Sequence, residues 1–172
     1  GEVELLGPLF LQVARWCQQR LPALTLVLPA ANPARRRQID AQLEDASDLA
    51  VSVFDGKSHA AMAAADAVLM ASGTTALEAM LLKRPMVVSY RVGKLTHLLV
   101  SRMVKLSYVS LPNLLAKRVL VPEFLQDDAT VENLGEALLA YLMHPENTAQ
   151  LRQQFLALHL DLRRDASATA AQ

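Results

Sequence analysis

The chain has 172 residues, of which 52% are hydrophobic, so it can bury a sizeable core and is expected to fold as one domain. Lys plus Arg and Asp plus Glu are equal at 17 each, which argues against the broad basic surface of a nucleic-acid-binding protein. The single cysteine, Cys17, excludes an internal disulfide framework and suits a reducing compartment. It lies beside Trp16 in a helical pattern, which favours buried packing over a nucleophile. No uninterrupted apolar run reaches the ~18 residues that a membrane-spanning helix needs.

Along the chain, apolar residues at helical spacing alternate with short apolar runs that are typical of strands. The predicted helices cover residues 2–20, a stretch from Pro33 onward that carries three consecutive arginines, and residues 60–65, 75–82, 94–105, 130–143 and 145–172. The predicted strands cover residues 24–28 (ended by Pro29), 49–54, 66–71 and 85–90, followed by a short extended piece at 108–111 and a turn-rich loop at 112–122. Ser58 and Thr130 are expected to cap the helices that follow them. This order predicts an α/β fold, a Rossmann-like parallel sheet with helices on both faces, ending in C-terminal helices.

The stretch from Asp66 to Glu78 reads as a buried strand, a tight Ser72-Gly73-Thr74 turn and the first turns of a helix. A glycine turn that leads into a helix leaves backbone N–H groups and the positive end of the helix dipole facing an anion, most often a phosphate. Glu78 lies one helical turn beyond Thr74, where its carboxylate could accept hydrogen bonds from two ribose hydroxyls. The pattern therefore predicts a phosphate and ribose site, although plain helix capping remains the alternative. The glycine spacing is neither that of a P-loop nor that of a dinucleotide fingerprint.

Ligands of open parallel sheets bind beyond the carboxyl ends of the strands. This rule places four predicted segments on one rim of the sheet: Phe54-Asp55-Gly56, Ser72-Gly73-Thr74, Tyr90-Arg91 and Leu111-Pro112-Asn113.

Residue spacing gives no indication of a metal site. The four histidines are scattered, and no Asp-x-Asp pair or cysteine cluster is present. Glu123 and the Asp127-Asp128 pair read as polar loop residues in contact with solvent. We therefore expect neither a metal ion nor another cofactor.

The predicted helix at 94–105 has a second face that carries three cations and one leucine: Lys94, Leu98, Arg102 and Lys105. A leucine flanked by cations could contact an anionic membrane surface or a partner, and an ordinary solvated helix is the alternative.

Longer motifs add to these patterns. The runs at 70–78, 85–91 and 108–116, together with 53–56 and 121–126, closely resemble the lipid-A-disaccharide synthase family. The match covers nearly the whole chain. Its Ser-Leu-Pro-Asn-Leu-Leu-Ala stretch at 110–116 is specific to that family. The Ser-Gly…Glu pattern is shared more widely by two-domain glycosyltransferases of the GT-B type.

The resemblance implies a bacterial enzyme of lipopolysaccharide (lipid A) synthesis. It would transfer 2,3-diacylglucosamine from UDP to 2,3-diacylglucosamine 1-phosphate, forming a β-1,6-linked disaccharide and releasing UDP. Such enzymes are inverting, need no metal and are peripheral to the cytoplasmic face of the inner membrane. Residues 1–172 would form a single UDP-sugar donor-binding domain, the C-terminal half of a GT-B enzyme. The acceptor domain with its general base, and a Pro-Gly-Ser-Arg turn found before the segment that resembles Gly1-Glu2-Val3, lie outside this sequence. We therefore expect a fragment that is inactive alone.

The resemblance also assigns roles to individual residues. The leaving diphosphate would be stabilised at the Ser72–Thr75 turn, the ribose held by Glu78, and the uracil edge met by backbone groups near Asp55. Asn113 would orient sugar or phosphate oxygens, because an amide cannot act as a base at neutral pH. The expected catalytic residues are Asn113 and Arg91. The expected UDP-binding residues are Phe54, Asp55, Gly56, Ser72, Gly73, Thr74, Thr75, Glu78 and Tyr90.

Two other functions stay open at this point. One is the donor domain of another GT-B enzyme that uses UDP-N-acetylglucosamine, such as a transferase or a 2-epimerase. The other is a nucleotide-binding or oligomerisation module without activity of its own. The sequence also leaves open whether the chain forms a homodimer and which acyl-chain length it would prefer.

Overall fold

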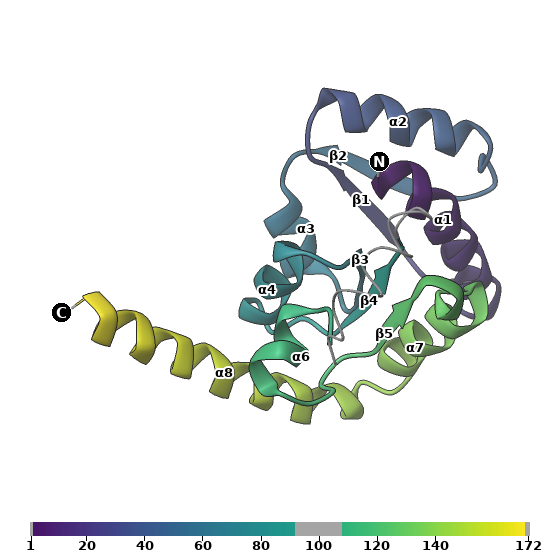
Figure 1. The fold of residues 1–172 in the computed structure, drawn as a ribbon. Coiled ribbons are helices and arrows are strands. Elements are labelled where there is room, and N and C mark those ends of the chain that lie inside the picture. The colour runs from purple at the N-terminus through teal and green to yellow at the C-terminus, as the bar shows by residue number, and fades with distance from the viewer. Residues whose placement is uncertain (1, 92–107, 171–172) are drawn as a thin grey trace.

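A computed structural model describes residues 2–91 and 108–170 of the chain. Helices and strands alternate along it, as Figure 1 shows, and the predicted α/β class is confirmed. The elements are α1 (Glu2–Arg20), β1 (Leu26–Ala30), α2 (Pro33–Glu44), β2 (Val51–Asp55), α3 (Ser58–Ala64), β3 (Val68–Ala71), α4 (Thr74–Leu81), β4 (Met86–Tyr90), α6 (Leu111–Ala116), β5 (Glu123–Leu125), the 3-10 turn η1 (Gln126–Asp128), α7 (Val131–Met143) and α8 (Glu146–Ala170). The helix predicted at 94–105 lies outside the described residues.

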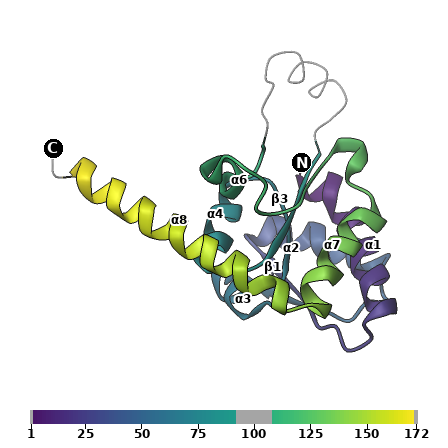
Figure 2. The ribbon, with the colours of Figure 1, turned by 90° about the horizontal axis from the view of Figure 1, so that it is seen from below.

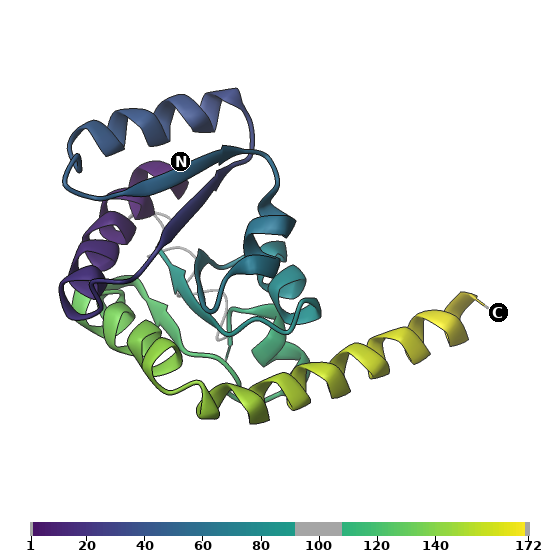
Figure 3. The same ribbon diagram turned by 180° about the vertical axis from the view of Figure 1, so that it is seen from behind.

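All described strand pairs are parallel, but they form two separate sheets. β1 pairs with β2, and β3, β4 and β5 form a second sheet in that order. We predicted one sheet, and among the described strands β1 and β3 share no ladder. Helices join the two sheets instead: α1 contacts α2, β3 and α7, whereas α3 contacts β1 and α4 (Figure 1; Figure 3 gives the view from behind).

Pro29 does not end the first strand, contrary to the prediction. It is the fourth residue of β1 and lies opposite Phe54 of β2. The carbonyl of the next residue, Ala30, accepts a hydrogen bond from Gly56 N–H (2.7 Å), so Ala30 turns its polar groups toward the β2 side. Successive residues of a strand turn their polar groups to opposite sides, so the Pro29 nitrogen points to the other edge of β1. A proline is tolerated there because no ladder hydrogen bond is lost.

Two further boundaries differ from the prediction. Residues 112–122 are not only a loop, because α6 occupies Leu111–Ala116. Pro112 lies in the first turn of α6, where a backbone N–H would have no intrahelical partner. Ser58 is the first residue of α3 rather than its cap, and Lys57 precedes it in a left-handed conformation (φ 56°). Thr130 caps α7 as predicted, since its side chain accepts from Asn133 N–H.

Helices cover both faces of the β3–β4–β5 sheet. On one face, α3, α4 and α8 supply a core around Met80 and Phe155. On the other, α1 and α7 supply a core around Val13 and Leu134. Adjacent strand residues point to opposite faces, so Val88 packs into the first core and Val87 into the second. This double cover explains why β4 has no exposed residue between Met86 and Ser89.

Helix α8 begins close to the predicted start at Pro145 and extends beyond the rest of the fold (Figure 2). Its first turns pack into the core through Leu151 and Phe155, whereas Leu156 and Leu160 are exposed. Within the described ranges, no helix has both the length and the apolar character to cross a membrane.

Helices α1 and α7 approach each other closely at Gly135. A Cβ atom built on Gly135 would overlap the six-membered ring of Trp16. The Gly135 carbonyl also accepts a weak hydrogen bond from the Cys17 thiol (3.8 Å). Cys17 is 1% exposed, and burial raises the pKa of its thiol to about 11. The predicted packing role of Cys17 is therefore confirmed.

We predict that Gly135→Ala lowers the free energy of unfolding by about 1–2 kcal/mol. The added methyl group forces Trp16 and α1 to shift, at a cost of about 1–3 kcal/mol, and the better helix propensity of alanine offsets up to about 1 kcal/mol. Urea denaturation measures the difference. Glu136→Ala, at the exposed neighbouring position, is the control and should stay within about 0.5 kcal/mol of the wild type. An unchanged midpoint for Gly135→Ala would contradict the close helix contact.

Candidate functional site

The predicted turn between β3 and α4 is formed at the carboxyl end of β3. Ser72 follows the last strand residue, Gly73 occupies the N-cap position, and α4 begins at Thr74. Gly73 has no side chain that could cap this helix. The first N–H groups of an α-helix have no intrahelical partner, so the positive end of α4 faces outward. Residues 70–75 line a hollow of about 310 Å³ at this point.

The side chains around this turn are open to solvent. Gly73, Thr74, Thr75 and Glu78 are all exposed, whereas Ala76, Ala79 and Met80 on the other side of α4 are buried. Within the described part of the chain, the Glu78 carboxylate has no hydrogen-bond or ion-pair partner. Because Glu78 is exposed, water can solvate its carboxylate and no buried partner is needed. Glu78 is available to a ligand one turn from the helix N-terminus.

Ser72 differs from the two threonines because its hydrogen is already engaged. Its hydroxyl donates to the Val109 carbonyl (2.8 Å), and its N–H donates to the Ser89 carbonyl (2.9 Å). A hydroxyl has one hydrogen to donate, so in this arrangement Ser72 can only accept from a ligand. Among the described residues of this turn, the donors that remain toward an anion are the N–H groups of Gly73, Thr74 and Thr75 and the hydroxyls of the two threonines.

Tyr90 and Arg91 lie at the end of β4, beside the turn. Tyr90 is in register with Leu125 of β5. The Arg91 guanidinium donates to two carbonyls of the following connection, those of Gln126 (3.2 Å) and Ala129 (2.9 Å). Arg91 therefore fastens the β5–α7 connection to the end of β4. Its expected role as a catalytic residue stays a prediction.

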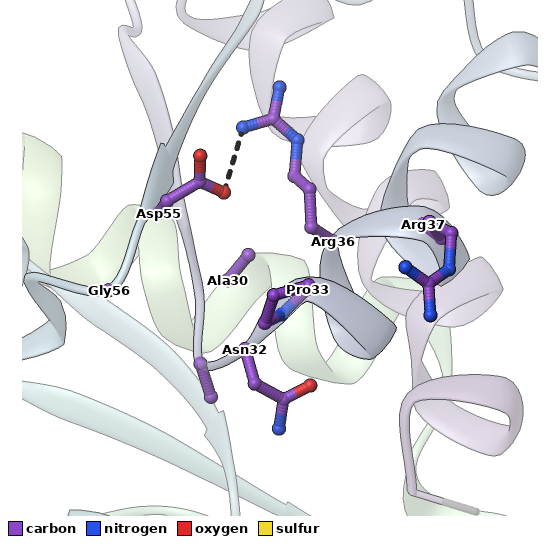
Figure 4. Close-up of a pocket in the computed structure, with 8 residues that line it drawn as sticks. Ala30, Asn32, Pro33, Arg36, Arg37, Asp55 and Gly56 are labelled. Carbon is purple, nitrogen blue, oxygen red and sulfur yellow. Dashed lines mark hydrogen bonds and ion pairs between the residues drawn. The ribbon is translucent and has the colours of Figure 1, made fainter.

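The Phe54-Asp55-Gly56 segment lies at a different hollow. Asp55 and Gly56 line a space of about 390 Å³ with residues 30–33, Arg36 and Arg37. Figure 4 shows Arg36 reaching toward Asp55, to which it donates a hydrogen bond of 3.1 Å. Gly56 has a positive φ of 65°, which suits glycine. The two hollows have no lining residue in common, so the structure does not bring Asp55 and Ser72 into one pocket.

Asn113, expected to orient substrate oxygens, is completely buried (0% exposed). Its Nδ2 donates to the Val121 carbonyl (2.9 Å) and to Glu123 Oε1 (2.7 Å). Its Oδ1 accepts from the N–H groups of Leu120 (2.7 Å) and Val121 (3.0 Å). Both amide hydrogens and the carbonyl oxygen are thus used inside the protein. A direct contact with substrate, which the resemblance implies, stays a prediction and would require one of these bonds to open.

Glu123 was interpreted as a solvent-exposed loop residue, and that interpretation is wrong. It begins β5 and accepts four hydrogen bonds, from Val109 N–H, Ser110 N–H, the Ser110 hydroxyl and Asn113 Nδ2. The sequence does contain a signal for this role. A carboxylate between Val121 and the apolar Phe124-Leu125 pair needs a buried partner, and Asn113 lies ten residues earlier.

No group of three or more His, Cys, Asp or Glu side chains that could hold a metal ion occurs in the described residues.

We predict that Asn113→Ala lowers the free energy of unfolding by about 2–4 kcal/mol. The substitution removes the hydrogen-bond partner of both the N–H and the carbonyl of buried Val121, and each buried unpaired group costs about 1–3 kcal/mol. Thermal and urea denaturation measure the loss. Asn133→Ala is a matched control, because Asn133 is exposed and, among the described residues, its side chain donates only to the Asp128 carbonyl. A loss below 0.5 kcal/mol, the range of ordinary surface changes, would contradict the buried network.

Comparison with known proteins decides the family. The whole chain, residues 1–172, matches the model of the family described as lipid-A-disaccharide synthetase. The chain belongs to this family. The resemblance that the 110–116 stretch predicted is therefore confirmed.

Several relatives named lipid-A-disaccharide synthase share about half of their aligned residues with this chain. The protein of Saccharophagus degradans is 52% identical over 172 residues, which cover 100% of this chain and 44% of the relative. The protein of Pseudomonas syringae pv. syringae is 54% identical over 171 residues, 99% of this chain and 44% of the relative. That of Chromohalobacter salexigens is 50% identical over 174 residues, 100% of this chain and 45% of the relative. The chain thus spans less than half the length of these relatives.

Proposed function

We propose that this chain is the donor-binding part of an inverting glycosyltransferase of lipid A synthesis. The donor would be UDP-2,3-diacylglucosamine, the acceptor 2,3-diacylglucosamine 1-phosphate, and the products the lipid A disaccharide and UDP. Family membership supports the reaction class. The single observation that supports the donor role is the N-terminus of α4, where Thr74 and Thr75 are exposed and Glu78, one turn further, has no partner among the described residues.

The proposed chemistry follows from charge. Inversion at the anomeric carbon builds positive charge on the sugar and negative charge on the departing UDP. The N–H groups and hydroxyls of Thr74 and Thr75, with the dipole of α4, would stabilise that negative charge. They already point outward, so little reorganisation is needed. No metal ion takes part in this proposal.

Glu78 would accept hydrogen bonds from the ribose hydroxyls, because it lies on the exposed side of α4 and is four residues from Thr74. The uracil would lie against Phe54, which is 45% exposed, and the backbone of Asp55 and Gly56. The Gly56 N–H already donates to Ala30, so the remaining backbone groups of this segment would meet the base. Tyr90 would border the sugar from the end of β4.

The acceptor domain and the membrane contact in this proposal involve parts of the protein that the structure does not describe. The longer relatives support an acceptor domain with the general base elsewhere in the whole protein, so turnover would need that part. The whole protein would be peripheral to the cytoplasmic face of the inner membrane. Lys94, Leu98, Arg102 and Lys105 would contact the membrane surface, and their support comes from the sequence pattern alone.

We predict that UDP binds this chain and that Glu78→Ala weakens binding by about 1–3 kcal/mol, or about 5–150-fold, the usual loss for a charged hydrogen-bonding partner. Titration calorimetry measures both affinities. Glu136→Ala removes an exposed glutamate from α7 and is the matched control, with unchanged affinity expected. Equal affinities for the wild type and Glu78→Ala would refute the ribose assignment. A wild-type chain that does not bind UDP would refute the donor role.

We also predict that replacing Lys94, Arg102 and Lys105 together by alanine reduces sedimentation with anionic liposomes, because each lost cation removes attraction of about 1 kcal/mol near such a surface. Cosedimentation of the whole protein at fixed salt concentration measures this effect. The control replaces Arg20, Arg152 and Arg164, exposed residues of α1 and α8, which changes the net charge equally. Equal loss in both triple variants would show that net charge alone is responsible.

A further inference from the structure

Glu123 is the centre of a hydrogen-bond cluster that connects β5 with the segment before α6. Its Oε2 accepts from Val109 N–H (3.0 Å). Its Oε1 accepts from Ser110 N–H (2.8 Å), the Ser110 hydroxyl (2.5 Å) and Asn113 Nδ2 (2.7 Å). Ser110 and Asn113 are both 0% exposed. A carboxylate suits this position, because it only accepts hydrogen bonds and every group that meets it here is a donor.

The cluster reaches the β3–α4 turn through one further bond. The Val109 residue that donates its N–H to Glu123 accepts the Ser72 hydroxyl on its carbonyl (2.8 Å). Val109 is therefore held from both sides, by β5 and by the turn after β3. Ser72 lines the hollow at the N-terminus of α4. Two hydrogen bonds thus separate the Glu123 carboxylate from the hydroxyl of a residue in the candidate site.

The direction of these bonds has a consequence for the ligand. Because Ser72 donates its only hydroxyl hydrogen to Val109, its lone pairs rather than its hydrogen face the remaining space. A phosphate would then be held by the donors of Thr74 and Thr75, whose placement depends on the Ser72 backbone. If Val109 moved, Ser72 would be free to donate elsewhere and the turn would lose one of its two fixed points, the other being the Ser72 N–H bond to Ser89 (2.9 Å).

We propose that Glu123 is a positioning residue for the diphosphate-binding turn, and that it acts through Val109 and Ser72 rather than by touching the ligand. The inference rests on the proposed function as far as it concerns UDP. The conformational part concerns the protein alone: the Glu123 carboxylate fixes the β3–α4 turn from the opposite side of β4.

Glu123→Gln tests the conformational part without a ligand. The variant keeps the size of the side chain but places an NH₂ group against at least one N–H donor. Amide hydrogen exchange of the chain, resolved by NMR, should become about tenfold faster at Ser72 and Ala76, whose N–H groups bond to Ser89 and Gly73. Leu134 in α7 should not change, and Glu136→Gln should alter none of these amides. Unchanged exchange at Ser72 and Ala76 would overturn the proposal, whether or not UDP binds.

A double-mutant cycle tests the route through Ser72. Glu123→Gln and Ser72→Ala should each weaken UDP binding by about tenfold in calorimetry. If Glu123 acts through Ser72, the double variant should be no more than about twofold weaker than the worse single variant. Additive losses, about 100-fold together, would overturn this route and assign Glu123 a general structural effect. The same cycle with Glu136→Gln should show no coupling.

Loss of UDP binding and failure of Glu123→Gln to fold have different consequences. If the wild-type chain does not bind UDP, the proposed function fails, and faster exchange at Ser72 and Ala76 in Glu123→Gln would still support the positioning role. If Glu123→Gln does not fold, Ser110→Ala replaces it, because it removes only the hydroxyl bond to Oε1. That variant should speed the same two amides by a smaller factor, and no change in them would overturn the proposal.

Discussion

Parallel pairing of β3, β4 and β5 is the constraint on which the site depends. Ala71 is in register with Ser89, and Tyr90 with Leu125, so the three strands end side by side. Whatever follows each strand must then meet at one edge. The turn that starts α4, the arginine that follows β4 and the connection that starts at Gln126 lie together for this reason. The cores on both faces hold the strands in this register, because a slip of one residue would exchange the residues of the two faces.

Local chemistry predicted much of this arrangement. The glycine turn, the apolar strand before it and the alternation of strands and helices each follow from propensities that act within a few residues. The boundaries that differ depend on partners far along the chain. Pro29 stays in a strand because β2 pairs with only one side of β1, and no local pattern contains that information.

The polar residues of the site show the same division. Thr74, Thr75 and Glu78 could be predicted, since their position in one helix determines which side they share. The hydrogen-bond partners of Asn113 and Glu123 could not, because they lie on a helix, a strand and two loops; the sequence indicated only that the Glu123 carboxylate needs a partner. The family motif marked Asn113 as important, and the structure shows that its side chain forms its hydrogen bonds within the protein. The N-terminus of α4 leaves polar groups open to a ligand, whereas the cluster around Glu123 pairs them within the protein. Two hydrogen bonds, through Val109, link the two.

The central claim is that the β3–α4 turn binds the diphosphate of a UDP-sugar. Amide shift changes in ¹⁵N-labelled protein during titration with UDP test it residue by residue. We predict that the largest shifts occur at Gly73, Thr74 and Thr75, with a smaller group at Asp55 and Gly56. Saturable shifts confined to residues 32–37, with the turn unchanged, would contradict the claim, and so would the absence of any shift at millimolar UDP.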